Sequence, residues 1–380
     1  MNSTGVESSK LPHVGLVLAT STGAVGAHVA SLARHLRGIG HEVTVFGPAA
    51  TDEQFGFAAL GAAFLPVEIS ASPSPVRDLL AARKLRKHSA GVDLLHAHGM
   101  RAGFVAAGAR RRPLVTTWHN LQLASGRRGR VLVHLERFLA CRVDVALGVS
   151  EDLAARLREF GAKDARLLPV GAAPLPPADR TRVEVRAELG CQDRPMLLTV
   201  ARLHPQKSLD VLINAAALWA KRDPVPLVVI AGDGPQRDEL AGLIDRLNAP
   251  VRLLGQRDDI ADLLAAGDIA VLPSQWEARS FFVQEALRAG LPSVVTDSGG
   301  MPAMVADAAR VVPVGDVMAL TDAVTDLLDD PAAAAQLAAK AVARGKQLPS
   351  EAESNAAIAA LYAQLLSTAQ SWSTTQAQQT

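Results

Sequence analysis

VGLVLATSTGAVGAHVASLARHLRGIGHEVTVFG, residues 14–47, contains one complete βαβ pattern. Two short runs rich in Val and Leu, residues 14–20 and 42–47, have the composition of buried strands. The segment between them has helical period and closes on Gly40, as helix ends often do. Parallel strands need such a crossover, so this stretch predicts the start of a parallel α/β sheet.

The pattern continues along the chain with one interruption. PVGAAPLPPADR, residues 169–180, has four prolines and the composition of a linker. Strand-like runs precede it at 93–99, 113–119, 143–150 and 165–171. Others follow it at 195–202, 226–234, 250–256, 269–274, 292–300 and 309–315. This order predicts an α/β fold of two Rossmann-like, doubly wound domains facing across a cleft, with the ligand at the carboxyl ends of the strands.

The expected domain boundaries follow from these segments. We predict an N-terminal domain over residues 1–173 and a C-terminal domain over 174–350. A last helix over 351–368 could pack back on the N-terminal domain, and the polar tail 369–380 is expected to be disordered.

Composition narrows the classes of function. The 380 residues are 49% hydrophobic and carry a formal net charge of +1, which argues against a dedicated nucleic-acid binder. The charge is uneven, at about +8 up to residue 177 and about −7 after it. Cys141 and Cys191 lie far apart, so neither a disulfide framework nor a cysteine zinc site is indicated. Because the sequence has no long apolar segment, we expect a cytoplasmic protein.

WEARSFFVQEALRAG, residues 276–290, places Glu277 and Glu285 eight residues apart. On one helix they would be about 12 Å apart along the axis, too far for the carboxyl pair of a glycosidase. The local sequence instead indicates a loop over 275–280 followed by a helix. Glu277 is then expected at the carboxyl end of a strand, and Glu285 about one turn into the helix.

This region carries a resemblance. The pattern S-x-x-E-x(7)-E-A-x-x-x-G-x-P-x-V, residues 274–294, resembles the donor-binding signature of the family 4 retaining glycosyltransferases, which have the GT-B fold. Further segments agree with that family in order and place, namely VARLHPQKSLDVL (200–212), AGDGP (231–235) and DSGGMP (297–302) in the second half, and the glycine loop, VDLLHAHG (92–99) and TTWHN (116–120) in the first.

The resemblance implies transfer of a hexosyl group from a nucleoside-diphosphate sugar to an acceptor hydroxyl, with retention. Arg202 and Lys207 are expected to neutralise the leaving diphosphate. Glu285 is expected to accept hydrogen bonds from the ribose, and Glu277 and His119 to contact the donor sugar. We therefore predict His119, Arg202, Lys207 and Glu277 as the catalytic group.

Glycines and one arginine complete the predicted donor site. Gly23 and Gly26 are expected in a loop before the first helix, where glycine lets backbone N–H groups approach an anion. TSTGAVGA is not G-x-G-x-x-G, so a dinucleotide site fits poorly, and a loop that contacts phosphate or the acceptor is favoured over a plain tight turn. Gly299 and Gly300 are expected to let backbone approach the donor, and Arg257 to lie near the nucleobase.

Neither a metal nor another cofactor is expected beside the nucleotide sugar, which is a co-substrate. His96 and His98 end the strand before His119, but no third zinc ligand has suitable spacing nearby, so His96 is predicted to be structural or peripheral. No Asp-x-Asp element follows a strand.

The chain also departs from the family pattern. Where the family commonly has Glu-Gly-Phe-Gly, this chain has Glu277-Ala278-Arg279-Ser280, and Ala303 replaces an acidic residue. These changes put the sugar identity in doubt. A non-catalytic nucleotide-sugar-binding protein and a nucleotide-sugar epimerase therefore remain as alternatives.

Basic segments at 82–88 and 126–142 fall in the positive half of the chain. The second is amphipathic enough to lie on an anionic membrane, and a helix that covers the sheet with its arginines in water is an equal alternative. We expect a small-molecule, glycan or lipid-linked acceptor, with the inner membrane surface as an alternative location to the bulk cytoplasm.

Overall fold

The computed structural model describes residues 11–21, 23–109, 113–121 and 126–377, without the side chains of 127, 128 and 368–377. The chain divides into two compact units. The first comprises Met1–Val170 and Glu351–Thr380, and the second Gly171–Ser350. The first crossing between them is three residues before the boundary expected after residue 173. Each unit contains one parallel sheet, as the sequence pattern predicts.

The first unit has a seven-stranded sheet in the order β3-β2-β1-β4-β5-β6-β7. Its strands are β1 (His13–Leu18), β2 (Glu42–Gly47), β3 (Ala63–Pro66), β4 (Leu94–His98), β5 (Leu114–Trp118), β6 (Val145–Gly148) and β7 (Ala165–Leu167). β3 is the strand that sequence periodicity missed, and its sequence AFLP lies half-buried at a sheet edge. The strand order reverses between β1 and β4, so the carboxyl ends of these neighbours form the switch point of this sheet.

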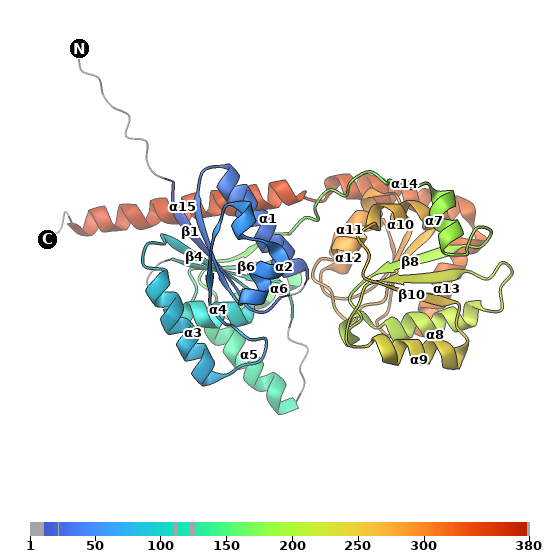
Figure 1. The fold of residues 1–380 in the computed structure, drawn as a ribbon, viewed down its shortest axis with the longest axis horizontal. Coiled ribbons are helices and arrows are strands. Elements are labelled where there is room, and N and C mark those ends of the chain that lie inside the picture. The colour runs from blue at the N-terminus through green and yellow to red at the C-terminus, as the bar shows by residue number, and fades with distance from the viewer. Residues whose placement is uncertain (1–10, 22, 110–112, 122–125, 378–380) are drawn as a thin grey trace, which may run out of the picture. The chain divides into compact units, whose positions relative to one another are not determined.

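Helices cover both faces of this sheet (Figure 1). They are α1 (Ala24–Gly38), α2 (Ala49–Phe55), α3 (Pro75–His88), α4 (Met100–Ala109), α5 (Gly126–Ala140), α6 (Glu151–Glu159) and α15 (Glu351–Ala377), with a short 3₁₀ turn η1 (Ala58–Leu60). α1 and α15 share one core with β1, β2 and β4, while α3, α4 and α5 lie together on the opposite face.

The second unit repeats the design with a six-stranded sheet in the order β10-β9-β8-β11-β12-β13. Its strands are β8 (Met196–Val200), β9 (Leu227–Ala231), β10 (Val251–Gly255), β11 (Ile269–Leu272), β12 (Ser293–Thr296) and β13 (Arg310–Val312). Its helices are α7 (Arg182–Glu188), η2 (Pro205–Lys207), α8 (Leu209–Trp219), α9 (Arg237–Leu247), α10 (Ile260–Ala266), α11 (Phe281–Arg288), α12 (Met301–Val305), α13 (Val317–Asp329) and α14 (Pro331–Gln347).

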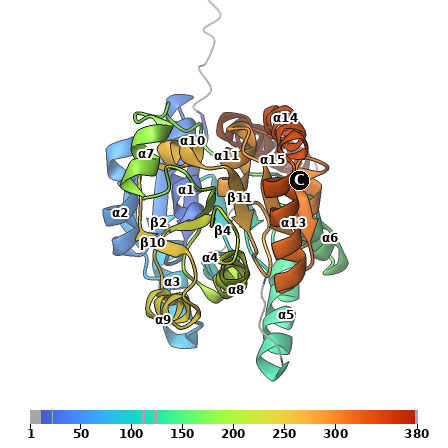
Figure 2. The same ribbon diagram turned by 90° about the vertical axis from the view of Figure 1, so that its right-hand side faces the viewer.

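Two cores enclose the second sheet. α7, α10, α11 and α12 pack on one face, and α8, α9 and α13 pack on the other (Figure 1 and Figure 2). Both faces of β8, β9, β11 and β12 are buried, which explains their uninterrupted apolar sequences. Here the switch point lies between β8 and β11.

The C-terminal helix α15 returns to the first unit. Ile358, Leu361 and Tyr362 are buried in the core that α1 forms with the sheet. The helix continues to Ala377, so the disordered tail expected from residue 369 is a wrong prediction as far as this residue. No glycine or proline after residue 350 interrupts the helix, and the polar tail sequence is compatible with it. Residues 378–380 lie outside the described part.

Among the described residues, no helix is both long and apolar enough to cross a membrane.

Candidate functional site

Five of the predicted site residues of the second unit follow three neighbouring strands at one edge of the sheet. Arg202 and Lys207 follow β8, Glu277 follows β11, and Gly299 and Gly300 follow β12. Because β8, β11 and β12 are adjacent and parallel, their carboxyl ends lie next to one another. These residues thus lie at the switch point, where α/β sheets bind ligands.

Lys207 and Glu277 form the central contact of this edge. The Lys207 ammonium donates a hydrogen bond to Glu277 Oε1 within an ion pair. Ser274 Oγ donates to the same oxygen at 3.1 Å. The Glu277 side chain is only 10% exposed, and this pairing offsets the cost of burying its charge. Sequence reasoning missed Ser274 as a partner of Glu277.

The η2 segment and the loop after β11 are also joined through Gln206. Its side-chain amide donates to the Trp276 carbonyl at 2.9 Å. The backbone carbonyl of Gln206 accepts from the Gln275 N–H at 2.8 Å. These bonds hold the segment that carries Lys207 against the segment that carries Glu277. Gln206 was not predicted, because nothing in its local sequence shows that it reaches a residue seventy positions away.

Gly299 and Gly300 pack against the backbone of the Glu277 loop. The Gly300 N–H donates to the Glu277 carbonyl at 2.8 Å. Gly299 has φ +56°, and a Cβ there would lie 2.3 Å from the Glu277 carbonyl oxygen. The glycine pair therefore allows two loops to meet, and its expected contact with the donor stays a prediction.

Arg202 is exposed at the end of β8, and His204 lies between it and Lys207. Burial, followed by the positive charges of Arg202 and Lys207, lowers the pKa of His204. The charges of both cations thus act on His204.

Glu285 is half-buried near the middle of α11. Burial raises the pKa of its carboxyl to about 7, and the Arg288 guanidinium opposes the rise only in part. No hydrogen bond or ion pair involves this carboxyl within the described part of the chain. A carboxylate that is buried without such partners is suited to accept hydrogen bonds from a ligand.

Arg257 lies in a network of charges in its own domain. Its guanidinium donates to both carboxyl oxygens of Asp259, at 2.7 and 2.6 Å, and to Glu188 at 3.1 Å. Asp259 first, with Glu188 adding to it, raises the pKa of Arg257 against the effect of burial. The structure pairs Arg257 with none of the other predicted donor residues, and its place near the nucleobase stays a prediction.

In the first unit, one of the two glycines expected in a loop lies in a helix. Gly23 caps α1, and a Cβ on it would meet open space, but Gly26 lies inside the helix rather than in a loop. A Cβ on Gly26 would lie 2.1 Å from the Phe55 ring, and its N–H bonds Ser21 Oγ at 3.1 Å. Gly26 is therefore needed for packing of α1, and its N–H is already used within the protein.

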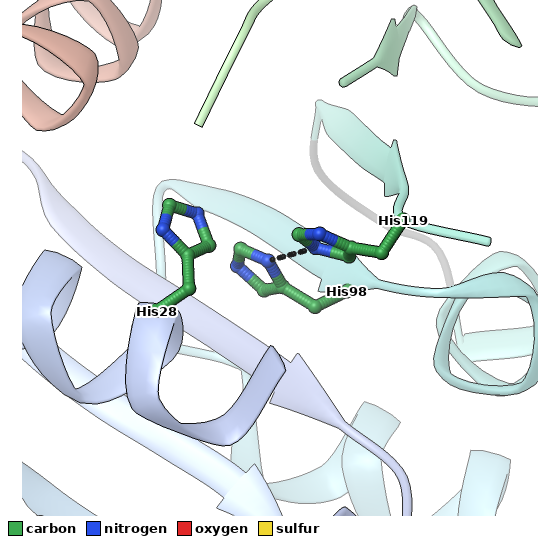
Figure 3. A group of neighbouring side chains, drawn as sticks. All are labelled: His28, His98 and His119. Carbon is green, nitrogen blue, oxygen red and sulfur yellow. Dashed lines mark hydrogen bonds between the residues drawn. The ribbon is translucent and has the colours of Figure 1, made fainter. Parts of the chain in front are cut away.

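Histidines gather at the switch point of the first sheet (Figure 3). His98 ends β4, His119 follows its neighbour β5, and His28 comes from α1. Pairwise, the three ring centroids are 5.4 to 5.6 Å apart, and His98 Nδ1 is 3.3 Å from His119 Nε2. Burial is the largest of the causes that lower the pKa of all three rings, to about 4 for His28. The rings are thus neutral at pH 7.

His96 has a different environment from these three rings. It lies within β4, with one ring nitrogen 2.6 Å from the Tyr362 hydroxyl of α15 and the other 2.7 Å from Thr117 Oγ1. Both nitrogens are therefore engaged inside the fold, in keeping with a structural role. His28 was missed by sequence reasoning, since seventy positions separate it from His98.

Two family models match the chain and together span most of it. Residues 23–173 match the glycosyl transferase 4-like domain, and residues 182–346 match the glycosyl transferases group 1. The chain is a glycosyltransferase of the family 4 type.

Two curated relatives of this glycosyltransferase are themselves named as transferases. A phosphatidyl-myo-inositol mannosyltransferase of Mycolicibacterium smegmatis is 29% identical over 86% of this chain and 85% of its own length. An alpha-D-kanosaminyltransferase of Streptomyces kanamyceticus is 35% identical, over 40% of each chain. The matched region thus spans less than half of that second relative.

Solved structures show the same fold. HepE of Anabaena, in complex with UDP, superposes with a TM-score of 0.79 over 93% of this chain and all of that one, at 22% identity. With its two parallel-sheet, Rossmann-like halves, the glycosyltransferase has the GT-B fold.

The structure explains part of the loop 278–280, in which this glycosyltransferase departs from its family pattern. Ser280 caps α11 by accepting from the Val283 N–H at 3.3 Å, which a glycine could not do. Ala278 is buried, and Arg279 is partly buried. Burial first, then the charges of Arg344 and Arg288, lowers the pKa of Arg279 to about 10. The guanidinium of Arg279 thus lies where the charges of Arg344 and Arg288 act on it.

Proposed function

We propose that this glycosyltransferase moves a hexosyl group from a nucleoside-diphosphate sugar to an acceptor hydroxyl, with retention at the anomeric carbon. The observation that carries the proposal is the contact of Lys207 with Glu277 at the switch point of the second sheet, beside Arg202. Two side-chain cations next to a carboxylate provide for both parts of a nucleotide sugar. The cations suit the diphosphate, and the carboxylate suits the sugar hydroxyls.

In this proposal the chemistry depends on charge. As the glycosidic bond breaks, negative charge grows on the leaving diphosphate, and Arg202 and Lys207 stabilise it without a metal ion. Glu285 holds the ribose hydroxyls. Glu277 orients the sugar, and so does His119, a role that rests on the family resemblance. The UDP complex of HepE supports a nucleotide donor, and the mannosyltransferase relative, similar over most of its length, supports transfer of a hexosyl group.

The acceptor class is proposed from the surface of α5. Val131, Leu135 and Phe138 follow one face of this helix and are 58%, 37% and 50% exposed. Arg130 and Arg137 are exposed on the same helix. Apolar side chains among arginines suit an anionic membrane surface, so we propose a lipid-linked acceptor presented there.

Lys207→Met and Glu277→Gln separate the role of Lys207 in the ion pair from its role toward the diphosphate. Both changes break the ion pair, but only the first removes the cation. We expect Lys207→Met to lose affinity for nucleoside diphosphates and to lower acceptor-dependent diphosphate release about a hundredfold or more. Glu277→Gln should keep diphosphate affinity and lower sugar transfer. A thermal-shift screen of nucleoside diphosphates and their sugars identifies the donor to use.

Three results would contradict this proposal. Equal loss of diphosphate binding in both variants would show that the ion pair only supports the fold. Nucleotide-sugar binding without diphosphate release in any acceptor extract would indicate a binding protein. Interconversion of two free nucleotide sugars would indicate an epimerase.

A further inference from the structure

His98 lies beside the histidine that the proposed function places at the donor sugar. It ends β4, and its Nδ1 is 3.3 Å from Nε2 of His119, which follows the neighbouring strand β5 (Figure 3). His98 is 2% exposed, whereas His119 is partly exposed. The buried ring of His98 is therefore a candidate for a group that acts on the donor through His119.

Both rings are neutral, so each carries one proton on one of its two nitrogens. Burial is the largest of the causes that lower the pKa of both imidazoles. In the hydrogen bond between them, one nitrogen must donate and the other must accept. The bond therefore couples the two rings, because the position of the proton on His98 decides its position on His119.

The second nitrogen of His98 indicates which ring donates. Within the described residues, His98 Nε2 is buried and has no hydrogen-bond partner. Protein interiors tolerate an acceptor without a donor better than an N–H without an acceptor. We therefore place the lone pair on Nε2 and the proton on Nδ1. His98 Nδ1–H then donates to His119 Nε2.

This direction of the bond defines what His119 can offer to a ligand. Because its Nε2 accepts, the single proton of the neutral ring stands on Nδ1. Within the described ranges, the His119 ring bonds no residue other than His98. Its Nδ1–H is thus left to donate to an oxygen of the donor sugar.

Packing keeps the two rings in this arrangement. Their planes are 24° apart and their centroids 5.6 Å apart. The ring of His28, on α1, stands edge-on to both, with centroid distances of 5.4 and 5.5 Å. His98 is also in register with Thr117 on the paired strand β5. Side chains held by rigid elements keep a hydrogen bond in one direction better than side chains on loops.

We propose that His98 is a positioning residue, which donates from Nδ1 to His119 Nε2 and so holds His119 in the Nδ1–H tautomer that donates to the donor sugar. The contact of His119 with the sugar rests on the proposed function. The tautomers of the two rings do not depend on it, so they can be tested separately.

The tautomers are measured by NMR on the full-length chain without substrate. In protein labelled with ¹⁵N-histidine, the nitrogen shifts distinguish a protonated ring nitrogen from an unprotonated one. We expect the Nδ1–H tautomer for both His98 and His119 in the wild type. In His98→Leu, which removes the donor, His119 should change to the Nε2–H tautomer that free histidine prefers. His98→Asn should keep Nδ1–H on His119, because its side-chain amide can donate from near the position of Nδ1.

Turnover distinguishes positioning from mere packing. His98→Leu should lower kcat for sugar transfer about tenfold, the contribution of one hydrogen bond, with nucleoside-diphosphate affinity unchanged. His98→Asn should recover most of this loss. His41→Gln is the matched control, since His41 is a buried histidine of the same unit whose Nδ1 is 2.9 Å from the Pro12 carbonyl. It should change neither the His119 tautomer nor kcat.

The proposal is overturned if His119 carries its proton on Nε2 in the wild type, or if His98→Leu leaves the His119 tautomer unchanged. Equal kcat for His98→Leu and His98→Asn would also overturn it. If His98→Leu fails to fold, the wild-type tautomers decide by themselves. Absence of transfer by the wild type would count against the proposed function alone, because the tautomers are measured without substrate.

Discussion

At the scale of single residues, Glu285 shows how a ligand site can cost stability. Its pKa of about 7 in the folded chain lies above the ordinary value of 4.5, because the carboxyl is buried. Between these two pH values the folded chain keeps a proton that the unfolded chain has released. The carboxyl therefore lowers the free energy of unfolding as the pH rises through this window.

Glu285→Gln should remove this cost. We expect the variant to equal the wild type at pH 4 and to exceed its free energy of unfolding at pH 8 by about 3 kcal/mol at most. Urea denaturation at the two pH values measures both quantities. The same variant should bind nucleoside diphosphates more weakly, because the ribose loses its carboxylate acceptor.

Glu239→Gln serves as the control, because Glu239 is an exposed glutamate of α9 in the same unit. It should show no gain that grows with pH. Equal stability of Glu285→Gln and wild type at pH 8 would mean that burial does not hold the proton on Glu285.

At the scale of elements, the exposed face of α5 can be tested by itself. Replacing Val131, Leu135 and Phe138 together by serine should reduce sedimentation with phosphatidylglycerol vesicles about tenfold or more, because the apolar contacts with the membrane are lost. The arginines of the helix remain, so residual binding should depend strongly on salt.

Leu218→Ser is the control for that experiment, since Leu218 is a similarly exposed leucine on α8 of the second unit. It should sediment as the wild type does. Wild-type protein that ignores anionic vesicles would remove the argument for a lipid-linked acceptor.

Comparison of the predicted with the observed strands and helices shows which elements the sequence pattern could predict. Apolar runs predicted twelve of the strands. The signal is strongest in strands such as β8, β9, β11 and β12, because a strand buried on both faces must be apolar throughout. β3, a half-buried edge strand, was the one that the sequence pattern missed. Gly26 was placed in a loop, although α1 begins at Ala24, since helix starts are poorly marked where no side chain caps them.

At the scale of the whole molecule, the chain crosses twice between its units, and the second crossing completes the first unit. Removing residues 351–380 should therefore destabilise a unit whose other residues end at Val170. Ile358, Leu361 and Tyr362 would leave cavities in its core, at about 2–5 kcal/mol each. We expect this truncated chain to aggregate or to lose the melting transition of the first unit.

Truncation after Ser367 is the matched control, because it keeps these three side chains. It should melt as the full chain does in differential scanning calorimetry. If the chain that ends at Ser350 melted as the full chain does, α15 would contribute no stability to the first unit.

What the sequence by itself determined is local. It specified the alternation of strands and helices, the two-fold repeat of that pattern, and which polar residues follow which strand. Arg202, Lys207 and Glu277 could be placed at the sheet edge in this way, because the segment just past a buried strand must emerge there, whereas Glu285 lies in α11 and was selected through the family resemblance.

Only the tertiary structure decided which strands are neighbours, and therefore which of these residues meet. The pairing of Lys207 with Glu277 depends on β8 and β11 being neighbours, although two strands separate them in sequence. His28, His98 and His119 come together because the strand order reverses between β1 and β4. Strand order results from the packing of two whole cores, and the spacing of residues along the chain does not reveal it.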